Sequence, residues 1–250
     1  MGRLAGKRAL MTGAAGLMGS DLARAFAREG ADLVLTTRTP SKLAPLLEEI
    51  RGLGVKAEGV GADFTHGDQI DRLAEQAWSA FGGLDIVVLT SQPTNPGAGD
   101  LITTPDETWR ELQETIVWGP LRLMRQLAPK MMDSGGGSIV TVISSTGLNP
   151  TPGFDAYGMA KGALWLMTRY MAKEWGKGGV RANAFNPGSI ITGDNEAALM
   201  ETAKRTGVLD RISLGRLGWT RECVSAAIYL ASDEASFTSG QLINIDGGRF

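Results

Sequence analysis

The stretch RALMTGAAGLMGSDLARAFAREGADLVLTTR, residues 8–38, joins an apolar run, a glycine-rich turn, an amphipathic segment of helical period and a second apolar run. Gly13, Gly16 and Gly19 are spaced three apart. The first glycine allows a tight turn, the second lets backbone approach a pyrophosphate, and the third permits close helix packing. The helix amino end adds N–H groups and a positive dipole. The stretch predicts a nucleotide-binding βα unit, although tight βα packing alone also uses such turns.

The same alternation of apolar runs and helical stretches continues along the whole chain. The strand candidates are RALMT (8–12), DLVLTT (32–37), KAEGVGAD (56–63), DIVVLTS (85–91), SIVTVIS (138–144), RANAFN (181–186) and QLINID (241–246). The helix candidates are 17–29, 40–53, 67–81, 105–133, 156–176, 195–206 and 220–232. This order predicts an α/β protein with a Rossmann-type, doubly wound, mainly parallel seven-stranded sheet and helices on both faces. No linker or composition shift interrupts it, so we predict one domain over residues 1–250.

Composition narrows the classes of ligand. The net charge is −2, with Lys and Arg scattered along the chain, which argues against binding to nucleic acid or to an anionic membrane. The only cysteine is Cys223 and the only histidine is His66, so we expect no intrachain disulfide and no metal site. No apolar run reaches the roughly 18 residues of a membrane span, and no signal peptide is visible. We predict a cytoplasmic protein that binds a small molecule.

Prolines predict several helix boundaries. In TPDE, Thr104 is the expected N-cap, Pro105 the first helical residue and Glu107 the partner in a capping box. The segment TPSK at 39–42 repeats the Thr-Pro signal. Pro120 and Pro129 lie inside the candidate helix 105–133, so we expect a kink or an early end there.

The end of the second predicted strand carries Thr36, Thr37 and Arg38. A carboxylate at this place would bind a free ribose 2′-hydroxyl, whereas a small hydroxyl followed by arginine accepts a 2′-phosphate. NADP(H) is therefore the predicted cofactor, with NAD(H) as the alternative. Arg38 as an ordinary solvated charge remains an open interpretation.

Tyr157 and Lys161 stand four positions apart in YGMAK, residues 157–161. On a helix they share a face, and an ammonium near a phenol favours the ionised phenol. An exposed helix pair of little energetic weight is the alternative. Ser144 follows a predicted strand, at the sheet end where ligands bind in open α/β folds. Its presence favours a catalytic site.

With the glycine-rich turn at 12–19 and YGMAK both in place, the chain resembles the short-chain dehydrogenase/reductase family, in its compact single-domain form, over nearly its whole length. Individually the remaining matches are weak, but together and in order they are specific. They are Asp63 after the third strand, GSIVTVIS (137–144), VRANAFNPGSIIT (180–192), LGRLG (214–218) and TSGQLINIDGG (238–248).

The resemblance implies roles for individual residues. Ser144 would polarise the substrate oxygen, and Tyr157 would exchange a proton with it. Lys161 would hydrogen-bond the nicotinamide ribose and lower the pKa of the phenol by roughly 2–3 units. A substrate-covering segment at 193–212 and assembly into a homotetramer are also implied. The expected cofactor contacts are Gly13, Gly16, Met18, Gly19, Thr37, Arg38, Asp63, Phe64, Tyr157, Lys161, Pro187, Gly188, Ile190 and Thr192.

Three places depart from the family pattern. Leu17 replaces the middle glycine of the compact form's turn. Residues 89–92, Leu-Thr-Ser-Gln, replace Asn-Asn-Ala-Gly after the fourth strand, although their hydroxyls can still bond backbone locally. Ile116 stands where relatives carry a proton-relay asparagine and cannot bind water. Thr115 or Ser91 is the candidate substitute for that asparagine.

We predict an NADP(H)-dependent oxidoreductase that reduces a ketone, or a related C=O or C=N group, of a small to medium apolar substrate, with Tyr157 as general acid. A lyase or isomerase in the same pocket and a non-catalytic nucleotide sensor are the alternatives. Gln92, Thr94 and Phe154 are the candidate substrate contacts. The tetramer prediction also rests on apolar helix residues that are either interface or core: Trp165, Met167, Tyr170, Met171 and Trp175.

Overall fold

The fold is built on one parallel sheet. The computed structural model describes residues 2–93, 99–191 and 196–249. The strands are β1 (Arg8–Met11), β2 (Asp32–Thr37), β3 (Ala57–Gly61), β4 (Ile86–Leu89), β5 (Gly137–Val142), β6 (Val180–Asn186) and β9 (Leu242–Asn244), in the order β3-β2-β1-β4-β5-β6-β9. Every neighbouring pair is parallel. The predicted fold class is confirmed, and the strand order changes direction between β1 and β4.

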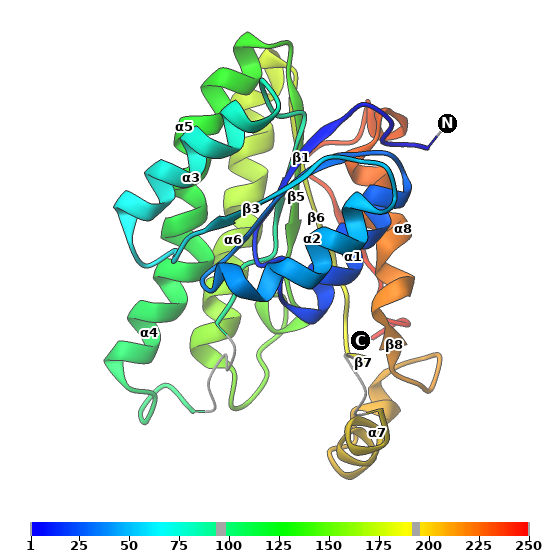
Figure 1. Ribbon diagram of the computed structural model, residues 1–250. Helices are drawn as coiled ribbons and strands as arrows, with labels where there is room; N and C mark the ends of the chain where they lie inside the picture. The colour runs from blue at the N-terminus through cyan, green and yellow to red at the C-terminus, as the bar shows by residue number, and fades with distance from the viewer. Residues whose placement is uncertain (1, 94–98, 192–195, 250) are drawn as a thin grey trace.

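Helices cover both faces of this sheet (Figure 1). On one face lie α3 (Gly67–Ala80), α5 (Gly119–Asp133) and α6 (Asp155–Trp175); on the other lie α1 (Leu17–Arg28), α2 (Ala44–Arg51) and α8 (Thr220–Ala231). The remaining elements are α4 (Asp106–Gln113), α7 (Glu196–Arg205) and a short separate pair, β7 (Ile190–Ile191) with β8 (Gly218–Trp219).

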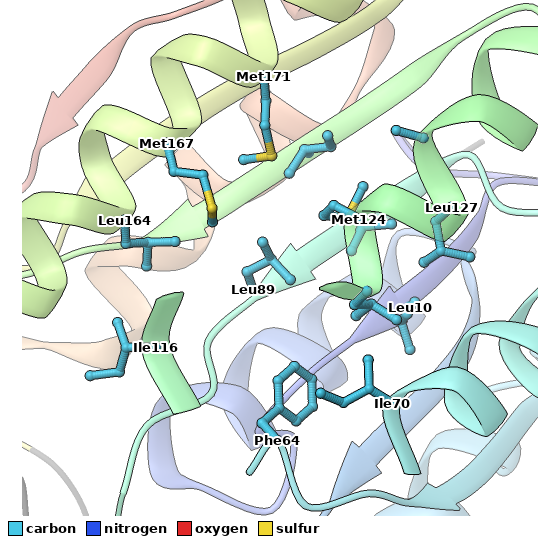
Figure 2. Close-up of a cluster of buried hydrophobic side chains, with 14 of the residues drawn as sticks. Leu10, Phe64, Ile70, Leu89, Ile116, Met124, Leu127, Leu164, Met167 and Met171 are labelled. Carbon is cyan, nitrogen blue, oxygen red and sulfur yellow. The ribbon is translucent and has the colours of Figure 1, made fainter. Parts of the chain in front are cut away.

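Each sheet face has its own apolar core. Leu10 enters the core beneath α3, α5 and α6, whereas its neighbours Ala9 and Met11 enter the core beneath α1, α2 and α8. This division follows because successive strand residues point to opposite faces. Figure 2 shows the first core, in which side chains from strands and helices meet around Leu89.

Two expected helix boundaries are wrong in detail. Pro105, not Thr104, is the N-cap of α4, and it makes no side-chain cap; the Thr104 hydroxyl instead donates to Asp155 Oδ1 at 3.4 Å. The candidate helix 105–133 is interrupted by a π-helical turn at Glu114–Trp118, just before Pro120. The helical backbone nevertheless runs through this turn, since Trp118 and Gly119 keep helical backbone angles and the Gly119 N–H bonds to the Glu114 oxygen. Turns of this kind occur within α-helices. The helix continues through Pro129 to Asp133.

Membrane-spanning helices and metal-binding clusters were both considered in residues 2–93, 99–191 and 196–249 as indicators of the class of protein. Within those ranges, no helix combines the length and apolarity needed to cross a membrane. The same ranges hold no group of three or more His, Cys, Asp or Glu side chains placed to bind a metal ion.

Candidate active site

A cavity of about 600 Å³ lies at the carboxyl ends of the central strands. It is lined by the glycine-rich turn after β1 and by residues that follow β2, β4, β5 and β6. This is the place where the strand order changes direction, the usual ligand position in open α/β sheets. Every predicted cofactor contact lines it except Lys161, which is buried beneath the wall, and Thr192, which lies outside the described residues.

The glycine-rich turn is shaped for an anion. Gly13 has φ +65°, and a Cβ there would come within 2.9 Å of Thr90 Oγ1. The turn leads directly into α1, whose N-cap, Gly16, offers no side-chain cap to the first N–H groups. Such N–H groups and the helix dipole attract a phosphate. Leu17, half exposed at the start of α1, lines the cavity without blocking it.

One buried polar atom at the cavity wall, the Thr36 hydroxyl oxygen, lacks a hydrogen-bond partner within the described residues. The Thr36 side chain is fully buried at the cavity wall, and within the described part of the chain its hydroxyl makes no hydrogen bond. Because buried polar groups are nearly always paired, this hydroxyl indicates that a ligand completes the wall. Together with the glycine-rich turn, it makes the cavity a fit for a dinucleotide.

Cations line the end of the cavity beyond β2. Arg38 lies there with Lys42, a residue that the sequence analysis missed. The sequence offered one signal for this role, a lysine four residues after Arg38. Whether that side chain points into the cavity depends on the 3₁₀ turn at Pro40–Leu43. Arg38 Nη1 is 3.7 Å from Glu111 Oε1, an ion pair between two half-exposed side chains.

Asp63, one of the predicted cofactor contacts, lines the same region of the cavity. Burial alone would raise the pKa of its carboxyl group. Hydrogen bonds from the Thr65 N–H and hydroxyl outweigh the burial, so the pKa is held below its usual value and the group is a stable carboxylate.

Ser144 and Tyr157 meet at the other end of the cavity. Ser144 follows β5 with extended backbone, and its Oγ accepts a hydrogen bond from Thr146 Oγ1 at 2.9 Å. Tyr157 lies in the first turn of α6, where its hydroxyl donates to Gln92 Oε1 at 3.0 Å. Both side chains therefore present hydroxyl groups at one place.

Lys161 lies one turn after Tyr157 and is 1% exposed. Its Nζ donates to the backbone oxygen of Val142 at 2.8 Å and stands 5.6 Å from the centre of the Tyr157 ring. The two side chains are thus adjacent, as the i, i+4 spacing predicts. The ammonium, however, faces the ring and a carbonyl rather than the phenolic oxygen.

The expected electrostatics of this pair are wrong. Burial raises the pKa of Tyr157 to about 12, with a hydrogen bond from Ser144 opposing the rise. Burial also lowers the pKa of Lys161 to about 7. Desolvation disfavours the charged form of each group, and a lysine that is often neutral exerts little pull on a phenol. Tyr157 is therefore a protonated hydrogen-bond donor.

The departures from the family pattern have structural explanations. The Thr90 hydroxyl donates to the backbone oxygen of Thr12 at 2.7 Å, and the N–H groups of Thr90 and Ser91 donate to Thr12 Oγ1 at 3.0 and 3.2 Å. These bonds join β4 to β1. Ile116 is fully buried in the apolar core (Figure 2), whereas Thr115 and Ser91 line the cavity.

The candidate substrate contacts and cover are placed as follows. Gln92 lines the cavity, Thr94 lies outside the described residues, and the Phe154 ring packs edge-on to Tyr157 with centroids 6.5 Å apart. None of residues 196–212 lines the cavity. Helix α7 instead stands apart from the sheet (Figure 1) and packs on a small apolar cluster with Ile212.

The apolar residues of α6 divide between surface and core. Met167 and Met171 are buried, Trp165 and Trp175 pack partly buried against the same core, and Tyr170 is 58% exposed. The interpretation of all five as surface residues is therefore wrong for the two methionines. Other exposed apolar side chains are Trp118, Met159 and Leu166.

A wholly parallel sheet, an anion-binding glycine turn and a Ser, Tyr and Lys set at the strand ends define a dinucleotide-binding α/β protein of the dehydrogenase class. A family model described as enoyl-(acyl carrier protein) reductase matches residues 13–249. The chain is 38% identical to an uncharacterized oxidoreductase of Mycobacterium tuberculosis, over 99% of this chain and 94% of that protein. It belongs to the short-chain dehydrogenase/reductase family and is an oxidoreductase.

Two solved structures are similar to it. An L-sorbose reductase from Gluconobacter frateurii complexed with NADPH and L-sorbose superimposes with a TM-score of 0.90, at 29% identity, over all of this chain and 99% of that one. A 7α-hydroxysteroid dehydrogenase complexed with NADH and 7-oxo glycochenodeoxycholic acid gives a TM-score of 0.90 at 30% identity, over 99% and 95% of the two chains. Relatives of this fold therefore use either nicotinamide dinucleotide.

Proposed function

We propose that this protein is an NADP(H)-dependent reductase of a ketone, or of a related C=O or C=N group, on a small to medium and largely apolar substrate. The observation that carries the proposal is that the Tyr157 and Ser144 hydroxyls open on the same cavity as the glycine-rich turn. That arrangement serves proton transfer to a substrate oxygen beside a bound dinucleotide. Neither a pure nucleotide sensor nor a scaffold requires it.

Different residues of the chain would bind the cofactor and transfer the proton. The Met18 N–H group and the Thr36 hydroxyl would hold the phosphates and ribose, while Pro187, Gly188 and Ile190 would flank the nicotinamide. The reduced nicotinamide supplies hydride when bound. Tyr157 carries a proton on the hydroxyl that faces the cavity and would give it to the substrate oxygen, with Ser144 holding that oxygen.

The preference for NADP(H) rests on charge. Arg38 and Lys42 line the cavity beyond β2, and Thr37 is the last residue of that strand. A 2′-phosphate carries a negative charge that two cations attract and that an acidic side chain at the strand end would repel. Glu111, which pairs with Arg38, is the competing carboxylate.

We further propose one cytoplasmic domain over residues 1–250, a cover formed by 193–212, and a homotetramer. Exposed Trp118, Met159, Leu166 and Tyr170 on neighbouring helical segments support an apolar contact between copies. A native mass equal to one chain would contradict the tetramer.

The test of the function is spectroscopic. The purified enzyme is mixed with NADPH, or separately with NADH, and a panel of ketones and imines, and absorbance of the reduced nicotinamide is followed. The proposal predicts loss of that absorbance only when a carbonyl or imine compound is present, and faster with NADPH. A lyase or isomerase would convert its substrate without any such loss.

A further inference from the structure

Gln92 places an amide beside the reacting hydroxyl. The resemblance puts this residue at the last position of the Asn-Asn-Ala-Gly pattern, where relatives carry no side chain. Here Gln92 lines the cavity, and its Oε1 accepts the hydrogen bond of the Tyr157 hydroxyl at 3.0 Å. The backbone just before it is fixed, because Thr90 and Ser91 are bonded to Thr12, the residue that follows β1. The amide is therefore held at the place where a substrate oxygen must bind.

Substrate binding changes the partners of this amide. The Tyr157 proton can serve one acceptor at a time, so a carbonyl oxygen that takes it deprives Gln92 Oε1 of its donor. Water can replace the donor while the cavity is open, since Gln92 is exposed. A bound substrate displaces that water, and an acceptor left unpaired is unfavourable.

The missing donor has a defined position. The phenolic oxygen and Gln92 Oε1 are 3.0 Å apart, so groups on two adjacent carbons of a substrate can face them side by side. A hydroxyl on the carbon next to the carbonyl would thus donate to Gln92 Oε1 while the carbonyl accepts from Tyr157. A methyl group in that position has no proton to donate.

We propose that Gln92 is a specificity-determining residue that selects α-hydroxy ketones. The inference rests on the proposed reductase function and narrows its substrate class: a largely apolar molecule with one hydroxyl beside the reacting carbonyl. The reaction itself is unchanged, because Gln92 gains and loses no proton and only exchanges one hydrogen-bond donor for another.

The test compares ketones that differ by one group. Hydroxyacetone and butanone, and phenacyl alcohol and propiophenone, are pairs in which a hydroxyl replaces a methyl of similar size. For each pair, kcat/KM with NADPH is measured for the wild type, for Gln92→Met and for Gln92→Gly. The intrinsic reactivities cancel when the hydroxyl-to-methyl ratio of a variant is divided by that of the wild type.

The proposal predicts that both variants lower this ratio about tenfold, the usual weight of one lost hydrogen bond. Gln76→Met, on an exposed position of α3, is the matched control and should leave the ratio unchanged. Equal losses for both members of a pair, or no loss, would overturn the inference and leave the reductase function intact. A wild type that binds NADPH but reduces neither these four ketones nor any ketone or imine of the wider panel would overturn both.

Discussion

Replacing Lys161 with methionine should stabilise the protein at neutral and lower pH. Lys161 is 1% exposed, and burial lowers its pKa from 10.5 to about 7. Between those values the unfolded chain binds more protons than the folded chain, so wild-type stability rises as the pH rises through this window. Methionine fills the same apolar space without a titrating proton, so the variant lacks that rise.

The size of the effect follows from two contributions. The shift from 10.5 to about 7 corresponds to about 5 kcal/mol against folding when the ammonium must stay charged. Methionine removes this cost but also removes the hydrogen bond to the Val142 carbonyl, and leaving that group unpaired costs about 1–3 kcal/mol. The variant should be more stable by about 2–4 kcal/mol near pH 6, and its advantage should shrink by about 4 kcal/mol by pH 10.

The assay is urea unfolding without added cofactor, at fixed protein concentration, at pH values from about 6 to about 10. Lys173→Met, an exposed position on the same helix, is the matched control. Taking the difference between variant and wild type removes titrations that the two proteins share. A difference in unfolding free energy that stays constant across this range would refute the assignment of a low pKa to Lys161.

Three further substitutions test the 2′-phosphate end of the cavity and the hydrogen bonds that Thr12 accepts from Thr90 and Ser91. Arg38→Ala and Lys42→Ala should each weaken NADPH binding about tenfold or more while changing NADH binding little, because only NADPH carries the 2′-phosphate; equal effects in fluorescence titrations of the two cofactors would contradict that role. Thr12→Val should lower the urea unfolding free energy by about 2–3 kcal/mol, because it leaves the buried N–H of Thr90 and the partly buried N–H of Ser91 without their acceptor. An unfolding midpoint equal to that of the wild type would show that these two hydrogen bonds are dispensable.

The sequence predicted what depends on local pattern. Alternating apolar runs and helical periods predicted all seven strands of the sheet. The signal is clearest for the central strands, because a strand buried on both faces is apolar along its length. The i, i+4 spacing also predicted that the Tyr157 and Lys161 side chains lie next to each other. These features depend on residues that are close together in the sequence, within one or two neighbouring helices or strands.

What the sequence could not give depends on contacts between distant segments. Thr104 failed as a cap because its hydroxyl bonds to Asp155, and the Gln92–Tyr157 contact joins residues in different elements. Lys42 reaches the cavity only through the direction of a 3₁₀ turn. The pKa values of Tyr157 and Lys161 are set by burial, a property of the whole fold that a four-residue spacing does not contain.

The central claim is that the Tyr157 hydroxyl gives the proton to the substrate oxygen, and Tyr157→Phe tests it most directly. Steady-state turnover with NADPH is measured for wild type and variant, together with the Kd for NADPH. We predict that kcat falls by about a hundredfold to ten-thousandfold while the Kd changes less than about threefold. A variant that turns over at the wild-type rate would contradict the assignment of Tyr157 as general acid.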